Sequence, residues 1–163
     1  MAAVRQTVYT AKDAAAVTRV AEVTLKHWAS RGIIVPSGEG KGYSFCDLVL
    51  ARVAHVLRDR SMPEKDILRC VRALATLPHE DFAEAHSFSS QKAGVGLVWA
   101  LGPEGDSVRI VRTMAEVSAE MERALGVDAG GDALVADAIV VIDVGSHARQ
   151  MREALRDHQL EPV

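Results

Sequence analysis

In the first half of the chain, apolar residues recur with the period of a helix in four separate stretches. The first is the alanine-rich segment Ala11–Ala16, which begins after Thr10, a residue type that caps helix amino termini. The second places Leu25 and Trp28 on one face and ends at Gly32, where a glycine is typical of a helix end. The pattern predicts two short helices joined by a tight turn.

An extended segment and a glycine-rich loop follow the second helix. Residues 33–36 are apolar up to a proline, and the next residues, SGEGKGY, have the composition of a turn or hairpin loop. A third helix is predicted from about Phe45 to Arg60, because its valines and leucines repeat at i, i+4, i+7 and i+8. A fourth is predicted to begin near Ser61, with Pro63 in its first turn. Its expected core face consists of Ile67, Leu68, Val71 and Leu74.

The second half of the chain has a different pattern. Residues 78–93 are polar without clear periodicity and are predicted to form a linker. Beyond them, apolar and β-branched residues predict a β-hairpin, a helix at 113–125, a strand at Ala138–Val144 and a last helix at about His147–His158. We therefore expect an α+β protein whose second part is a small α/β module of strand, strand, helix, strand and helix. The predicted division is a mainly helical domain at residues 1–77, a linker at 78–93 and the α/β module at 94–163.

Charge separates the two halves in the same way. Residues 1–72 carry twelve Lys and Arg against seven Asp and Glu, a net charge of +5. Residues 73–163 carry seven against fifteen, a net charge of −8, and the whole chain has a net charge of −3. A basic surface attracts phosphate, so the amino-terminal half is the part expected to contact nucleic acid.

Other features argue against several classes of protein. No apolar stretch approaches the roughly 18 residues that span a bilayer, so we expect no membrane association and place the protein in the cytoplasm. Cys46 and Cys70 have no metal-ligand spacing and are expected to be buried thiols. Neither a nucleophile motif nor a phosphate-binding loop is visible. We therefore expect no metal, no cofactor, no catalytic residue and no enzymatic activity.

The segment from Tyr9 to Pro36 has the sequence YTAKDAAAVTRVAEVTLKHWASRGIIVP. It resembles, without a gap, the amino-terminal end of the MerR family of transcription regulators. Residues 24–28 are similar to the family's signature of Thr, Leu, a basic residue and two aromatic residues, and residues 31–33 to its Arg, Gly, Leu stop. The similarity continues through residues 41–67, KGYSFCDLVLARVAHVLRDRSMPEKDI, which resemble the family's wing and the helix pair after it.

This resemblance implies a winged helix-turn-helix whose second helix lies in the major groove of double-stranded DNA. It implies phosphate contacts from Lys26 and His27 on that helix and from Lys41 and Tyr43 on the wing. Residues near the start of the helix are expected to contact base edges, and these are Glu22, Val23 and Thr24. The predicted DNA-binding set is completed by Thr10 and Arg31.

The sequence departs from the family at three points. Arg19 stands where the family usually has a glycine in the turn, and a positive φ at a residue with a Cβ costs on the order of 1 kcal/mol. His27 replaces a tyrosine or similar aromatic residue. The family's long dimerisation helix is missing, because the apolar periodicity fades after Leu77 and strands follow.

A homodimer is nevertheless expected. One such domain covers only roughly 600 to 1,000 Å² of a DNA interface, and a two-fold dimer on an inverted repeat doubles the contact. Since the usual helix is absent, residues 94–163 are predicted to hold the dimer. The predicted contacts are apolar residues on the two helices of the module, Met121, Met151 and Leu155.

Two hypotheses for function remain open. The first is a dimeric transcription regulator that binds an inverted-repeat operator and whose α/β module dimerises and also takes a small ligand or a partner protein. The alternative is an antitoxin-like or phage-type factor whose carboxy-terminal module binds a partner protein, with DNA binding secondary. The operator sequence and the direction of regulation do not follow from the sequence.

Overall fold

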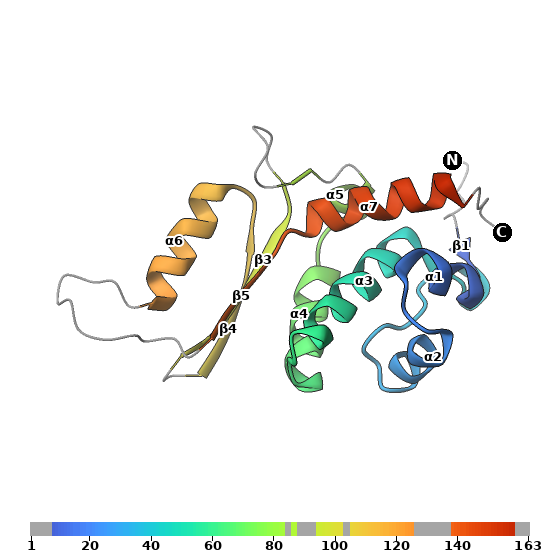
Figure 1. The fold of residues 1–163 in the computed structure, drawn as a ribbon, viewed down its shortest axis with the longest axis horizontal. Helices are drawn as coiled ribbons and strands as arrows, with labels where there is room; N and C mark the ends of the chain where they lie inside the picture. The colour runs from blue at the N-terminus through green and yellow to red at the C-terminus, as the bar shows by residue number, and fades with distance from the viewer. Residues whose placement is uncertain (1–7, 84–85, 88–93, 103–104, 126–137, 159–163) are drawn as a thin grey trace.

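The computed structural model of the protein describes residues 8–83, 86–87, 94–102, 105–125 and 138–158. A helical half packs against one face of a small sheet, and one helix covers the other face (Figure 1). The first elements are β1 (Val8–Tyr9), α1 (Ala11–Thr18), α2 (Glu22–Ser30), the 3-10 helix η1 (Glu39–Lys41), β2 (Tyr43–Ser44), α3 (Phe45–Asp59), α4 (Glu64–Ala75) and α5 (His79–Ala83). The later elements are β3 (Gly96–Gly102), β4 (Gly105–Val111), α6 (Met114–Leu125), β5 (Ala138–Ile142) and α7 (Val144–Asp157). The expected mixed fold, with a helical first part and a strand, strand, helix, strand, helix module, is confirmed. None of the described helices is long and apolar enough to cross a membrane.

α3 is the central helix of the helical half. It contacts α1, α4, α5 and α7, and eight of its fifteen residues are buried. Of the predicted stripe, Val49, Val53 and Leu57 are fully buried, and Val56 is half-buried. A helix that is apolar on several sides is stable only when neighbouring elements cover those sides.

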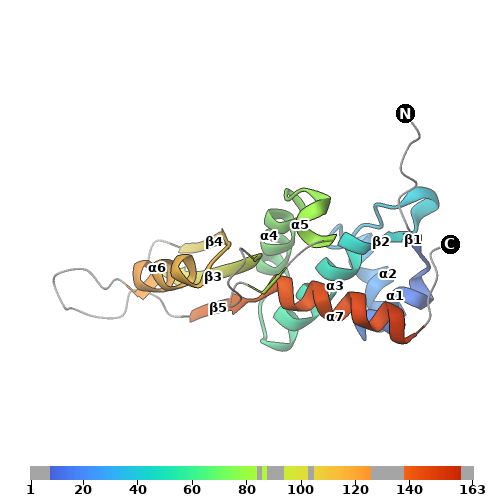
Figure 2. The ribbon, with the colours of Figure 1, turned by 90° about the horizontal axis from the view of Figure 1, so that it is seen from above.

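The three strands form an antiparallel sheet in the order β4-β3-β5. Successive side chains of a strand point to opposite faces. Leu97 and Trp99 of β3 therefore face the helical half, whereas Val98 faces α6 and packs with Val111 and Val117. Figure 2 shows the same layers from above, with the sheet between α6 and α4.

The last helix returns to the first elements of the chain. α7 lies along α3 and also contacts α1 and α5 (Figure 1). It begins earlier than predicted, because the carboxylate of Asp143 caps it by accepting the backbone N–H of Ser146 at 3.1 Å. Val144, Ala148 and Met151 of α7 are buried in the same core as α3.

The predicted linker contains a helix. α5 lies within it, and Phe82 of α5 is among the most completely buried side chains. A five-residue helix with one buried residue is too short to produce a visible period. The main core runs from residues of α1 to residues of α7, so it continues on both sides of the predicted linker. The division into domains stays a prediction.

α4 begins at Glu64, slightly later than expected. Ser61 has φ +62, a left-handed conformation that a helix does not accept, and Pro63 is the N-cap. The predicted core face of α4 is otherwise present, with Ile67, Val71 and Leu74 buried and Leu68 half-buried.

Gly145 permits the close approach of α7 to residues 86–87. A Cβ at Gly145 would lie 1.7 Å from the backbone oxygen of His86. We expect Gly145→Ala to lower the free energy of unfolding by roughly 1–3 kcal/mol, although Gly→Ala within a helix ordinarily stabilises a protein. Urea denaturation measures the change.

The matched control is Gln150→Ala, an exposed position of the same helix, for which the change is expected to stay within about 0.5 kcal/mol. A Gly145→Ala variant as stable as the unmodified protein would contradict this packing of α7.

Candidate nucleic-acid interface

The turn between α1 and α2 fixes the angle at which α2 leaves the body of the protein. Arg19 has φ 58 and ψ 27, so the positive φ expected at this position is present. Thr18 supports the turn, because its Oγ1 donates to the oxygen of Ala14 at 2.6 Å and accepts the N–H of Val20 at 3.3 Å. From α3, Arg52 donates to the oxygen of Thr18 at 3.3 Å. These bonds hold a turn that strains Arg19 by on the order of 1 kcal/mol.

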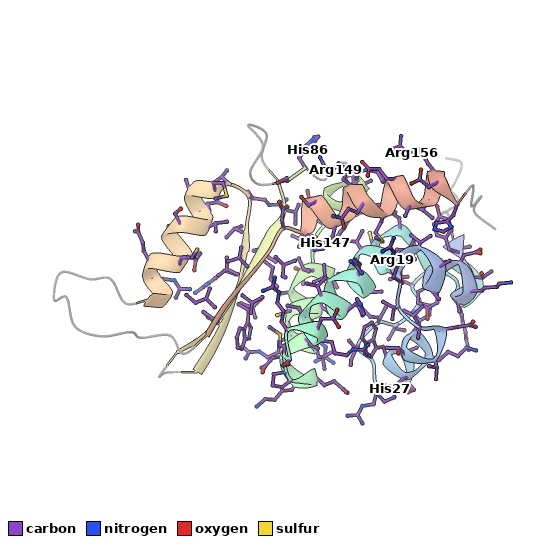
Figure 3. The ribbon with its side chains drawn as sticks, in the orientation of Figure 1. Arg19, His27, His86, His147, Arg149 and Arg156 are labelled. Atoms are coloured by element: carbon purple, nitrogen blue, oxygen red, sulfur yellow. The ribbon has the colours of Figure 1, made fainter. Side chains whose placement is uncertain are left out.

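α2 has one buried face and one exposed face. Leu25 and Trp28 are 0% and 3% exposed, as their spacing predicts, whereas Val23 is 74% exposed. Lys26 and His27 are also exposed, and Figure 3 shows His27 on the outer side of the helix. Because the inner face of α2 is buried in the core, the orientation of the helix is fixed and its outer face points to solvent.

The first turn of α2 combines a weak ion pair with free backbone donors. Lys26 Nζ lies 3.2 Å from Glu22 Oε1, and both side chains are exposed. An exposed pair of this kind contributes little stability, so a phosphate can replace the carboxylate at low cost. The N-cap, Ala21, makes no side-chain capping bond, so the first N–H groups of α2 can donate hydrogen bonds to an anion.

Two arginines surround the other end of α2. The Nε of Arg31 lies 2.8 Å from Glu64 Oε1 and thereby ties the end of α2 to the start of α4. The guanidinium of Arg58 lies 5.5 Å from the centre of the Trp28 ring, within range of a cation–π contact. Arg58 was not among the predicted residues, because no local sequence pattern relates it to Trp28, thirty positions earlier.

The wing is the tight loop that precedes β2 and packs on β1. Tyr9 of β1 pairs with Tyr43 of β2, and the loop before β2 includes η1. Gly40 and Lys41 both have positive φ, and Lys41 is exposed. A Cβ at Gly38 would lie 2.2 Å from Val8 Cγ1, so the close packing of the loop on β1 requires a glycine there.

Asp47 anchors this wing to α3. Its carboxylate accepts the backbone N–H of Ser37 at 2.8 Å, the hydroxyl of Ser37 at 2.8 and 2.9 Å, and the N–H of Ser44 at 2.9 Å. The Ser44 hydroxyl accepts the Asp47 N–H in return, which makes a capping box. Asp47 is not among the residues predicted for the site, although the spacing of Ser44 and Asp47 is the signal of such a box.

Two predicted DNA-binding residues also have structural roles. Tyr43 is 4% exposed, and burial, then Asp47 and Glu22, raise its pKa, so its hydroxyl stays protonated. Thr10 caps α1 by accepting the Asp13 N–H at 3.1 Å. Their contact with DNA stays a prediction, as does that of Thr24, which is half-buried.

The three predicted dimer residues lie in two places. Met121 is 37% exposed on α6, and Met114 on the same helix is 48% exposed. Met151 of α7 is 4% exposed and belongs to the core of the chain itself. Leu155 is half-buried against that core. The structure does not bring these three residues together, because α6 and α7 lie on opposite sides of the sheet (Figure 1).

Both cysteines are free thiols. Cys70 is fully buried, whereas Cys46 is half-buried and its Sγ lies 2.9 Å from His79 Nδ1. Burial, with a smaller effect of Asp47, raises the pKa of Cys46 to about 11. Within the described part of the chain, no group of three or more His, Cys, Asp or Glu side chains is arranged to hold a metal ion.

Residues 9–74 match the sequence model of a family described as MerR HTH family regulatory protein. The matched range runs from β1 to α4 and contains the turn, α2, the wing and α3. No curated protein matches the chain at a significant level.

Removal of the wing anchor should destabilise the protein. Asp47→Asn keeps the volume of the side chain but replaces one accepting carboxylate oxygen with an NH₂ group, which can only donate. A donor of Ser37 or Ser44 therefore loses its partner. We expect the free energy of unfolding to fall by roughly 1–3 kcal/mol, as measured by urea denaturation. Asp59→Asn, an exposed position on the same helix, is the control, and equal stability of the two variants would refute the anchoring role.

Proposed function

We propose that this protein regulates transcription by binding duplex DNA, on the premise that residues 9–74 are a helix-turn-helix domain of the MerR type. The observation that carries the proposal is the orientation of α2. Val23, Lys26 and His27 face solvent on a helix whose opposite face is buried. A recognition helix needs such a rigidly presented row of side chains to enter a major groove. No catalytic step is part of this proposal.

We assign the contacts by position on the domain. Lys26, His27 and the wing residue Lys41 are cationic or hydrogen-bonding groups suited to phosphates, which set register and affinity. Arg31 and Arg58 add positive charge beside the end of α2. Base edges would be contacted from the start of the helix, by Glu22, Val23 and Thr24.

We further propose a homodimer that binds an inverted repeat and is held by the carboxy-terminal part of the chain. A single domain of this size makes a small DNA interface, which two-fold symmetry doubles. Met114 and Met121 are exposed apolar residues on α6, the helix farthest from α2. We therefore place the contact at Met121, whereas Met151 lies inside the protomer's own core.

The assignment of contacts is tested on a duplex selected from a random pool and on a scrambled version of it. Lys26→Ala should weaken binding to both duplexes by a similar factor, because a phosphate contact carries no sequence information. Val23→Ala should weaken mainly the selected duplex, by roughly 1 kcal/mol. Arg149→Ala is the control, since Figure 3 shows Arg149 on α7, away from His27.

Equal effects of Lys26→Ala and Val23→Ala on the two duplexes would argue against this division of roles. Failure of the folded protein to select any sequence would argue against the function itself and favour a protein-interaction factor.

The dimer is tested by sedimentation equilibrium of the full chain. Met121→Glu puts a charge in the proposed interface and should raise the dimer dissociation constant at least tenfold, because an unpaired charge is costly to bury. Ala119→Glu adds the same charge to an exposed position on another side of α6 and should leave assembly unchanged. A monomeric unmodified protein, or a dimer insensitive to Met121→Glu, would contradict this interface.

A further inference from the structure

A cavity of about 370 Å³ lies between the segment that follows α2 and the ends of three other helices. Residues 32–35 and Ser37 form one wall, and the start of α3, the end of α4 and α5 form the rest. Its floor is apolar and consists of buried residues, namely Ile34, Leu50, Val71 and Phe82. The volume is near the lower end of the range of small-molecule sites, roughly 300–1,000 Å³.

Charge is distributed unevenly around this cavity. Arg72 is its one lining Lys or Arg residue, is exposed, and makes no ion pair with the residues that the structure describes. Asp47 is the one lining carboxylate, and the donors of Ser37 and Ser44 already engage it. The cavity therefore offers a free positive charge and no free negative charge.

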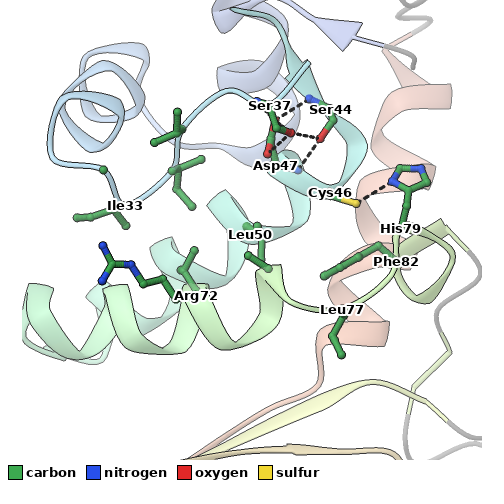
Figure 4. A pocket seen from close by; sticks show the side chains of 15 residues that line it. Ile33, Ser37, Ser44, Cys46, Asp47, Leu50, Arg72, Leu77, His79 and Phe82 are labelled. Carbon is green, nitrogen blue, oxygen red and sulfur yellow. Dashed lines mark hydrogen bonds between the residues drawn. The ribbon is translucent and has the colours of Figure 1, made fainter. Parts of the chain in front are cut away.

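The side of the cavity opposite Arg72 is polar, and the Cys46 thiol on that side is uncharged. Figure 4 shows Arg72 beside Ile33 on one side, and Cys46 with His79 on the other. Because the pKa of Cys46 is raised to about 11, the thiol stays protonated at neutral pH, and its Sγ lies within hydrogen-bond distance of His79 Nδ1, at 2.9 Å. His79 is thereby held in position by a residue of α3, which closes this end of the cavity.

We propose that the cavity binds a small organic anion with an apolar body, such as a medium-chain or aromatic carboxylate. The carboxylate pairs with the Arg72 guanidinium, whose planar set of donors matches its geometry. The apolar body lies on the floor formed by Leu50, Val71 and Phe82. An apolar floor with one charged group at the rim favours such a molecule over a cation or a fully polar solute.

The cavity is placed so that its occupant acts on DNA binding, an extension that rests on the proposed function. One wall follows α2 directly, and the other, at Ala75, Leu77 and Phe82, leads toward the sheet. A ligand that contacts both walls binds most tightly to the position of α2 in which both walls fit the ligand, and so favours that position. Its binding therefore changes the affinity of the protein for DNA, and DNA changes the affinity for the ligand by the same factor.

Calorimetry of the full chain with octanoate, octylammonium and octanol tests the site in the absence of DNA. Octanoate should bind at least tenfold more tightly than the other two, since a charge-assisted pair is worth about that factor. Arg72→Gln should abolish this preference, and Ala75→Phe, at an exposed position of the lining, should block binding of octanoate. Arg69→Gln, on the same helix but outside the lining, should leave octanoate binding unchanged.

Equal affinity for the three probes, no octanoate binding, or octanoate binding that survives both Arg72→Gln and Ala75→Phe would overturn the site. Titration of the selected duplex with and without octanoate tests the coupling, and an unchanged DNA affinity would overturn it while the calorimetric site stands. A protein that binds octanoate as expected but no duplex would refute the proposed function and leave the ligand site intact.

Discussion

The structure depends on the burial of α3. This helix is apolar on several sides, and its buried residues include Leu48, Val53 and Leu57, each without exposed surface. No single neighbour can cover such a helix, so α1, α4, α5 and α7 all pack against it. Burial of the apolar surface of α3 thereby holds α1, near the start of the chain, and α7, the last helix, in one core. The part of the chain that carries the proposed DNA-binding face is stabilised by residues more than one hundred positions away.

This arrangement explains why α2 is available for binding. Leu25 and Trp28 are the buried residues of α2, and most of its other side chains are exposed. The turn at Arg19 fixes the start of α2, and the bonds of Asp47 to Ser37 and Ser44 fix the wing that follows it. The strain of a left-handed arginine is small beside the burial that the turn makes possible. The buried face of this short helix therefore contributes to stability, and its opposite face is the one that we propose for DNA recognition.

Local patterns in the sequence were sufficient for elements that bury one clear face. The spacing of Leu25 and Trp28 predicts which side of α2 is exposed, and the cap at Thr10 marks the start of α1. The continuous apolar run of β3 likewise predicts a strand, and both of its faces are covered in the structure. Residues 9–74, which also match a family model of helix-turn-helix regulators, are the part of the chain where these local patterns are clearest.

Contacts between distant elements could not be predicted in the same way. An apolar position such as Met151 indicates burial but not the partner, so a core contact with α3 and a dimer contact look alike in sequence. The pair of Cys46 and His79 and the cation–π contact of Arg58 depend on how helices cross, which no local period encodes. The start of α7 depended on the cap at Asp143, which our prediction for that helix did not use.

The central claim is that this chain binds duplex DNA through the basic face around α2, and the salt dependence of binding tests it most directly. The association constant of the full chain for a selected duplex should fall linearly with salt on a double logarithmic plot, with a slope of about −0.9 per phosphate neutralised. Lys26→Ala should reduce the magnitude of that slope by about 1. Absence of binding by the folded protein at low salt, or an affinity that salt does not change, would contradict the claim.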